Sequence, residues 1–138
     1  MELEVSSDVR QQLVAQATDA HPRECCGILL GARDKGDQIT AIRPANNIHP
    51  QPETHFDIDP QALIDAHRDA REGGPQVIGY YHSHPDGLAE PSVTDQQQAA
   101  RDGSIWAIIA SDEITFWRDA GIDGEGGFEP LPYRIVDR

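Results

Sequence analysis

Two histidines and one aspartate are the residues in this sequence that are best suited to chemistry. His82 and His84 stand two positions apart, and Asp95 follows shortly after them. Side chains at positions i and i+2 of an extended chain project to the same side, so both imidazoles can face one ion. Two imidazoles and one carboxylate suit zinc, and three protein ligands leave the fourth tetrahedral position for water. This spacing indicates a catalytic zinc site.

Glu24 is the candidate base for such a site, because a metal-activated water must give up a proton. It directly precedes the apolar run 25–31. A carboxyl group at the mouth of a buried strand has a raised pKa, which suits a residue that accepts and returns a proton. Taken singly, each feature has a simpler alternative: Glu24 as an exposed acid, the histidine pair as a chance occurrence, and Ser92 with Asp95 as a helix capping box. The joint arrangement supports the site.

Local patterns show which elements must position these residues. The predicted strands are residues 2–5, 25–31, 38–45, 56–58, 76–81, 104–110, 114–117 and 133–136. The predicted helices are residues 7–20, 60–72 and 92–101, and the predicted loops include residues 46–54, 83–91 and 121–132. The predicted strand 76–81 ends directly before His82, and the third predicted helix carries Asp95. These elements predict an α/β fold, a mixed sheet with helices packed on it, in one domain spanning residues 1–138.

Composition narrows the classes of partner. The chain has 138 residues and a net charge of −13, so a nucleic acid would be repelled. No apolar run approaches the roughly 18–20 residues that cross a bilayer, and the first residues lack an apolar signal segment. We therefore expect a cytoplasmic protein that binds neither nucleic acid nor membrane. The sequence does not determine the oligomeric state.

The acidic excess has two explanations. The sequence holds 15 Asp but a single lysine, Lys35, and arginine supplies the other basic residues. Such an excess keeps proteins soluble in high salt, which suggests a salt-adapted source. An ordinary acidic bacterial protein is the alternative, and the composition does not distinguish the two.

Cys25 and Cys26 are the two cysteines of the chain, and they are adjacent. A disulfide between neighbours on a strand would be strained, and their spacing does not match a Cys-x-x-Cys site. This absence of a disulfide framework fits a reducing compartment. A cysteine peptidase using either thiol with His82 is conceivable, but thiols buried in a strand are poor nucleophiles.

The motifs then resemble a known family. His82-Ser83-His84-Pro85, the spacer 85–91 and Ser92-x-x-Asp95 together resemble the JAMM signature His-x-His-x(7)-Ser-x-x-Asp. Residues 24–31 resemble the upstream Glu-x-Cys-Gly strand of that family, and Ile78-Gly79 also matches. The chain is therefore similar to JAMM/MPN (JAB) zinc metallopeptidases of the short bacterial type, over most of residues 1–120.

The resemblance implies a fold and a function. The fold would be a three-layer α/β/α arrangement similar to cytidine deaminases. His82, His84 and Asp95 would bind Zn²⁺, Glu24 would be the general acid and base, and Ser92 would hydrogen-bond the oxyanion. The enzyme would hydrolyse an amide or isopeptide bond after the Gly-Gly tail of a ubiquitin-like or sulfur-carrier protein. A C-terminal cysteine, a lysine isopeptide and a longer extension all remain open as leaving groups.

Two other classes of function are compatible with this fold. Members of the family without metal ligands are non-catalytic interaction scaffolds, which is the main alternative. A zinc deaminase would need His-x-Glu and Pro-Cys-x-x-Cys motifs, and the sequence has neither.

Overall fold

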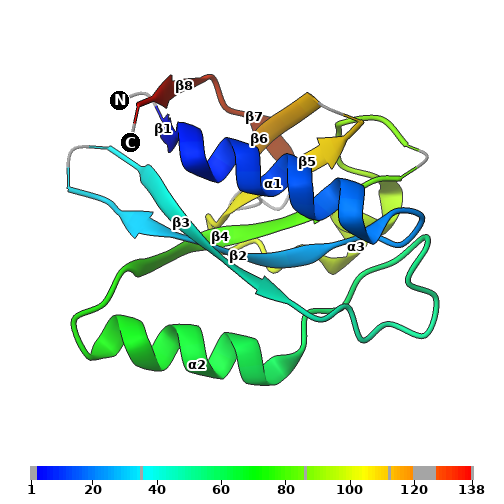
Figure 1. The fold of residues 1–138 in the computed structure, drawn as a ribbon, viewed down its shortest axis with the longest axis horizontal. Coiled ribbons are helices and arrows are strands. Elements are labelled where there is room, and N and C mark those ends of the chain that lie inside the picture. Colours follow the sequence, from blue (N-terminus) through cyan, green and yellow to red (C-terminus); the bar gives the residue numbers. More distant parts are fainter. Residues whose placement is uncertain (1–2, 35, 86, 112, 120–126, 138) are drawn as a thin grey trace.

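A mixed sheet with helices on both faces forms the body of the protein (Figure 1). The computed structural model describes residues 3–34, 36–85, 87–111, 113–119 and 127–137. The strands are β1 Leu3–Ser6, β2 Cys26–Ala32, β3 Gln38–Ala45, β4 Gln76–Ser83, β5 Ile105–Ala110, β6 Glu113–Asp119, β7 Phe128–Pro130 and β8 Tyr133–Val136. The helices are α1 Ser7–Ala20, α2 Pro60–Arg71 and α3 Val93–Gln98. Within these residues the strand order is β7-β6-β5-β4-β2-β3-β1-β8.

Neighbouring side chains of β2 pack into two apolar cores, one on each face of the sheet. Leu29 is buried with Val9 and Leu13 of α1 on one face of the sheet. Ile28, its neighbour, is buried with Ala66 of α2 on the other face. Figure 1 shows α1 and α2 on opposite sides of the central strands. The expected three-layer α/β/α arrangement is therefore confirmed.

Strand β4 is the central element that carries the two histidines. It runs antiparallel to β2, with His82 opposite Cys26, and parallel to β5, with His82 opposite Ile108. Its Gly79 lies so close to β5 that an added Cβ would stand 1.7 Å from the carbonyl oxygen of Ile105. A larger residue would push these strands apart, so the glycine before the histidines has a packing reason.

Three expectations about local structure are wrong in detail. Residues 56–58 form no strand, and only an isolated bridge joins Asn47 to Ile58. Helix α3 ends at Gln98 rather than at residue 101. Part of the expected loop 121–132 is the strand β7, which pairs with β6, while residues 121–126 lie outside the described part of the chain.

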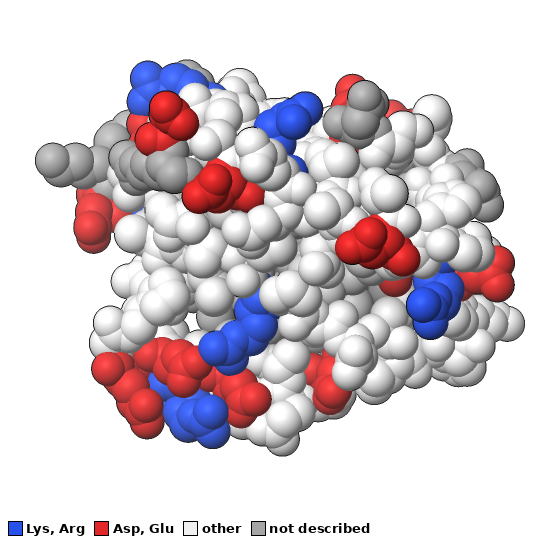
Figure 2. Space-filling view, viewed as in Figure 1, with Lys and Arg blue, Asp and Glu red and all other residues white. Residues whose placement is uncertain are grey.

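The charge distribution agrees with the acidic composition. Acidic side chains are spread over the face seen in Figure 2, and they gather with basic ones over the C-terminal end of α2. Among the described residues, no helix is long and apolar enough to cross a membrane.

Candidate metal centre

The end of β4 and the start of α3 bring the three predicted metal ligands together. The Nε2 atoms of His82 and His84 lie 3.0 Å apart. Asp95 Oδ2 lies 3.2 Å from the Nε2 atom of His82 and 3.1 Å from that of His84. The two Nε2 atoms and Asp95 Oδ2 therefore form a triangle with sides of 3.0–3.2 Å. This group could hold a metal ion.

Asp95 is held in place by the first turn of α3. The backbone N–H of Ser92 donates to Asp95 Oδ2 at 2.9 Å, and the backbone N–H of Asp95 donates to Ser92 Oγ at 3.0 Å. Burial raises the pKa of Asp95, but hydrogen bonds from His82 and His84 outweigh it and hold the pKa well below its usual range. The capping box predicted as an alternative is therefore present, and its carboxylate also faces both histidines.

Each histidine is oriented by a different kind of contact. His84 Nδ1 lies 2.8 Å from the carbonyl oxygen of Leu88, which can only accept, so this nitrogen carries the proton and Nε2 is free to bind a metal. The ring of His82 stacks on Phe56 at 4.3 Å and meets Trp106 edge-on at 5.5 Å. The His82 Nδ1 atom is buried and has no hydrogen-bond partner among the residues that the structure describes.

Burial and hydrogen bonds shift the pKa values of the two histidines in opposite directions. Burial lowers the pKa of His82, which is fully buried, and so favours the neutral ring. For His84, burial acts in the same direction, but hydrogen bonds to Asp95 and to Leu88 raise the pKa overall. A neutral imidazole is the form that binds a metal ion.

Glu24 lies where the sequence predicts it, at the mouth of β2 beside the ligand group. Its side chain is 7% exposed. Burial is the main cause that raises its pKa to about 7, while the charge of His84 lowers it and that of Asp95 raises it. A carboxyl group with a pKa near neutrality can both take and return a proton.

Asn47, which was not among the residues predicted from sequence, holds the backbone of Glu24 in place. Its Nδ2 donates to the carbonyl oxygens of Glu24 and His55, at 3.1 and 2.9 Å. Its Oδ1 accepts the backbone N–H of Asp57 at 3.0 Å and that of His49 at 3.1 Å. Asn47 therefore ties the loop that carries Phe56 to the strand that carries Glu24. Its position in a polar loop gave no signal of this role.

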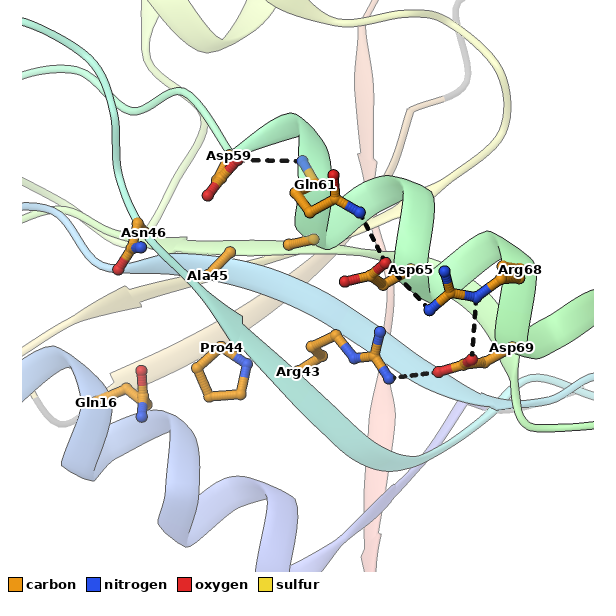
Figure 3. Close-up of a pocket in the computed structure, with 11 residues that line it drawn as sticks. Gln16, Arg43, Pro44, Ala45, Asn46, Asp59, Gln61, Asp65, Arg68 and Asp69 are labelled. Atoms are coloured by element: carbon orange, nitrogen blue, oxygen red, sulfur yellow. Dashed lines mark hydrogen bonds and ion pairs between the residues drawn. The ribbon is translucent and has the colours of Figure 1, made fainter.

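Two of the hollows on the protein surface bear on where the site lies. The cleft, of about 380 Å³, opens beside the ligand group. It is lined by Glu24, Glu53, Thr54, His84, Pro85, Gly87, Leu88, Glu90, Pro91, Ser92 and Thr94. The groove, of about 630 Å³, follows β3 between α1 and α2 (Figure 3). It is lined by Gln16, Arg43, Pro44, Ala45, Asn46, Asp59, Gln61, Ala62, Asp65, Arg68 and Asp69.

The groove is larger, but the cleft holds the chemistry. Glu24, His84 and Ser92, three of the five predicted site residues, line the cleft. The other two, His82 and Asp95, are buried directly behind them. None of these residues lines the groove. The five predicted residues therefore meet at one place.

The two cysteines are free and buried. Burial raises the pKa of Cys25, and burial is also the main cause that raises the pKa of Cys26 to about 12. Protonated, buried thiols are inert, and this argues against a cysteine peptidase.

Fold and site define a metal-dependent hydrolase architecture, and the comparisons name its family. Residues 6–120 match the family described as prokaryotic homologs of the JAB domain, so the chain belongs to this family. A solution structure of a protein from Desulfitobacterium hafniense shares the fold with a TM-score of 0.85 and 27% identity, over 99% of this chain and 94% of that one. A JAB1/MPN domain protein from Archaeoglobus fulgidus, with a TM-score of 0.64 and 18% identity over 99% of each chain, shares the fold.

Three enzymes are among the relatives. A desampylase of Haloferax volcanii is 29% identical over 80% of this chain and 81% of its own length. A probable TtuB-protein conjugate cleaving protease of Thermus thermophilus is 34% identical over 67% of this chain and 57% of its own length. A CysO-cysteine peptidase of Mycobacterium tuberculosis is 27% identical over 79% of this chain and 73% of its own length.

Proposed function

We propose that this protein is a cytoplasmic zinc metallopeptidase that hydrolyses the bond after the Gly-Gly tail of a ubiquitin-like or sulfur-carrier protein. The observation that carries the proposal is the meeting of three metal-ligand atoms with a buried carboxyl group of raised pKa, in one open cleft. The names of the relatives support the class of substrate, because two of them specify a protein conjugate or a carrier–cysteine bond.

The donor set supports zinc as the metal. Ligand atoms at about 2.0–2.1 Å from a tetrahedral ion stand about 3.3 Å apart. The nearest ligand atoms of His82, His84 and Asp95 are 3.0–3.2 Å apart, so an ion needs only a small outward movement of the side chains. Two neutral nitrogens and one carboxylate oxygen suit zinc better than calcium or magnesium, which prefer all-oxygen sites.

Hydrolysis would use this chain's residues in three roles. His82, His84 and Asp95 would hold the ion, which supplies a Lewis acid and lowers the pKa of water to about 7. Glu24 would take the proton of the attacking water and deliver it to the leaving nitrogen as the C–N bond breaks. Ser92, which lines the cleft, would donate the hydrogen bond of its hydroxyl to the developing oxyanion.

The first experiment compares the protein with its Glu24→Gln variant. Both are analysed for zinc and assayed on a carrier fusion that continues beyond a Gly-Gly tail. We expect about one zinc per chain in both, with turnover at least about 10²-fold slower in the variant. Undiminished turnover by the variant would identify a different base. A folded, metal-replete protein without zinc would refute the site.

The non-catalytic scaffold remains the second candidate, and one experiment separates it from the enzyme. His84→Ala removes one ligand and leaves the backbone of β4 intact. In the enzyme, this change would remove zinc and turnover together. In a scaffold, binding of the partner would survive the change and no turnover would be present in either protein.

A further inference from the structure

The loop that follows β4 orients one of the candidate metal ligands. The carbonyl oxygen of Leu88 lies 2.8 Å from His84 Nδ1, so the orientation of the His84 ring depends on where this loop lies. Leu88 is 71% exposed and therefore contributes little burial that could hold the loop in place. The backbone N–H of Gly87 donates to the carbonyl oxygen of His84 at 3.3 Å, a contact between the loop and its own first residues. A contact with another element is needed to fix the position of Leu88.

Thr115 of β6 supplies this contact. Its hydroxyl group donates to the carbonyl oxygen of Ala89, the residue after Leu88, at 2.6 Å. The described residues of the loop, 85 and 87–91, make no other hydrogen bond to a strand. The hydroxyl group of Thr115 therefore anchors the loop to the sheet at the residue next to the carbonyl that contacts His84.

Trp117 orients the hydroxyl group of Thr115. Its indole Nε1–H, which can only donate, lies 2.8 Å from Thr115 Oγ1. The indole takes one acceptor position of the hydroxyl group, so the hydroxyl proton stays available for Ala89. Thr115 lies opposite Ile108 of β5, and Ile108 lies opposite His82 of β4. The anchor is therefore built into the same part of the sheet as the candidate metal ligands.

Two acceptors compete for the single proton of a neutral His84 ring. The carbonyl oxygen of Leu88 faces Nδ1 at 2.8 Å, and Asp95 Oδ2 faces Nε2 at 3.1 Å. A proton on Nδ1 leaves the lone pair of Nε2 for a metal ion, whereas a proton on Nε2 blocks it. A well-placed Leu88 carbonyl favours the first tautomer, and its displacement favours the second.

We propose that Thr115 is a positioning residue for the metal site. Its hydroxyl group holds the loop so that the Leu88 carbonyl keeps the proton of His84 on Nδ1 and leaves Nε2 for the ion. This inference rests on the proposed function, which supplies the metal. Direct hydrogen-bond partners of metal-binding histidines commonly contribute roughly 10–100-fold to metal affinity or activity. Thr115 acts through the loop rather than by touching the ring, so its contribution should be smaller.

Zinc affinity tests the proposal without an activity assay. Thr115→Val keeps the shape of the side chain and removes the hydroxyl group. Its apparent Kd for zinc, measured by competition with a chelator, should rise about three- to tenfold. Thr115→Ser keeps a hydroxyl donor, and its Kd should stay within about twofold of that of the unmodified chain. Thr115→Ala, which also lacks the hydroxyl group, replaces the valine variant if that variant does not fold.

Tyr133→Phe is the matched control. Tyr133 and Thr115 line the same hollow of about 450 Å³. The Tyr133 hydroxyl group donates to the carbonyl oxygen of Ile114 at 3.0 Å, so this variant also loses a hydrogen bond from a hydroxyl group to a backbone carbonyl. The lost bond does not involve the loop, and the Kd for zinc should not change.

The tautomer of His84 is a readout that a merely structural role would not change. Long-range ¹H–¹⁵N correlation spectra of the metal-free protein, recorded where the ring is neutral, should show the proton on Nδ1 in the unmodified chain and in Tyr133→Phe. In Thr115→Val, the form with the proton on Nε2 should gain population, while the far-ultraviolet circular dichroism stays the same.

Trp117→Phe tests the outer part of the arrangement. This variant should weaken zinc binding about twofold, because the Thr115 hydroxyl group loses its orienting donor. Combined with Thr115→Val, it should add no further loss, since Trp117 acts through that hydroxyl group. An additional loss in the double variant would overturn the role assigned to Trp117.

The outcomes separate this inference from the proposed function. An unchanged Kd and tautomer in Thr115→Val, or equal losses in Thr115→Val and Tyr133→Phe, would overturn the inference and leave the metallopeptidase intact. Weak zinc binding by Thr115→Ser would also overturn it, because the hydroxyl group would not be the cause. A folded, unmodified protein that binds no zinc would overturn the proposed function itself, and the tautomer of His84 would still show whether Thr115 anchors the loop.

Discussion

The groove beside β3 and the cleft at the ligand group both contain many charged side chains, but their charges differ in pairing. In the groove, Arg43 contacts Asp69 at 2.6 Å, and Arg68 contacts Asp65 at 3.1 Å (Figure 3). In the cleft, the carboxyl group of Glu24 is buried with a raised pKa. In the groove, opposite charges lie in pairs and neutralise each other. A buried carboxyl group with a shifted pKa lowers stability, and such groups are typical of functional sites. Volume alone would select the wrong hollow.

After Glu24, substitution of Ser92 should have the largest effect on turnover among the residues of the cleft. Ser92→Ala removes one oxyanion donor and should lower kcat by roughly 10²–10³. Zinc should be retained, because the backbone N–H of Ser92, not its hydroxyl, holds the Asp95 carboxylate. The measurement is kcat together with zinc content, with Ser92→Thr as the control that keeps a hydroxyl group. Loss of helical structure in Ser92→Ala would show that the cap is its main role.

The buried carboxyl group of Glu24 should lower the stability of the folded protein, and this effect should grow as the pH rises. Burial raises the pKa of Glu24 from its ordinary value of 4.5 to about 7, so the folded state binds the proton more tightly than the unfolded chain. Stability therefore falls as the pH rises from about 4.5 to 7 and stays lowered above that range. In the metal-free protein, Glu24→Gln should raise the free energy of unfolding by about 3 kcal/mol at pH 8 and leave it unchanged at pH 4.

Urea unfolding of both proteins at the two pH values measures this difference. Glu72→Gln, which changes an exposed acid outside the cleft, is the control for loss of one negative charge. The quantity to compare is the gain in the free energy of unfolding that Glu24→Gln gives at each pH. An equal gain at pH 4 and pH 8 would show that the carboxyl group is adequately solvated. The contrast with the groove would then disappear.

Asn47 should have an intermediate effect on both stability and turnover. Asn47→Ala leaves the partly buried carbonyl groups of Glu24 and His55 without this donor, which should cost about 1–3 kcal/mol. The loosened Glu24 should lower kcat about tenfold while zinc content is kept. Asn46→Ala is the matched control, because Asn46 is exposed and lines the groove instead. Equal effects of the two substitutions would refute a positioning role for Asn47.

The groove should give the smallest effect. Arg43→Gln or Asp69→Asn breaks an ion pair whose side chains are both about one third or more exposed. Such pairs contribute about 0–1 kcal/mol, and turnover should stay within about twofold of the unmodified protein. Urea unfolding measures the stability, and the assay on the Gly-Gly carrier fusion measures turnover. A large loss of turnover would mean that the groove, and not the cleft alone, receives the substrate.

Residues whose chemistry is local in sequence could be predicted, and those whose role depends on the path of a loop could not. His82 and His84 follow from spacing on one strand, and Asp95 follows from the first turn of one helix. Asn47 and Phe56 act only because the loop between β3 and α2 folds back over β4. The alternation at residues 56–58 predicted a strand, but the Asn47 side chain takes up the N–H of Asp57 and replaces a ladder bond. The single-domain organisation of residues 1–138 stays a prediction.

Asp95 has two roles, as a helix cap and as a candidate metal ligand, and this limits which substitutions the position tolerates. Its carboxylate accepts the N–H that starts α3 and also faces both histidines. The helix has only six residues, which is too short to be stable without such a cap. A substitution of Asp95 by a residue without a side-chain acceptor would therefore remove a metal ligand and also weaken the start of α3. A descendant of this protein that lost its catalytic role would still be expected to keep a side-chain hydrogen-bond acceptor at this position, such as an acid or an amide.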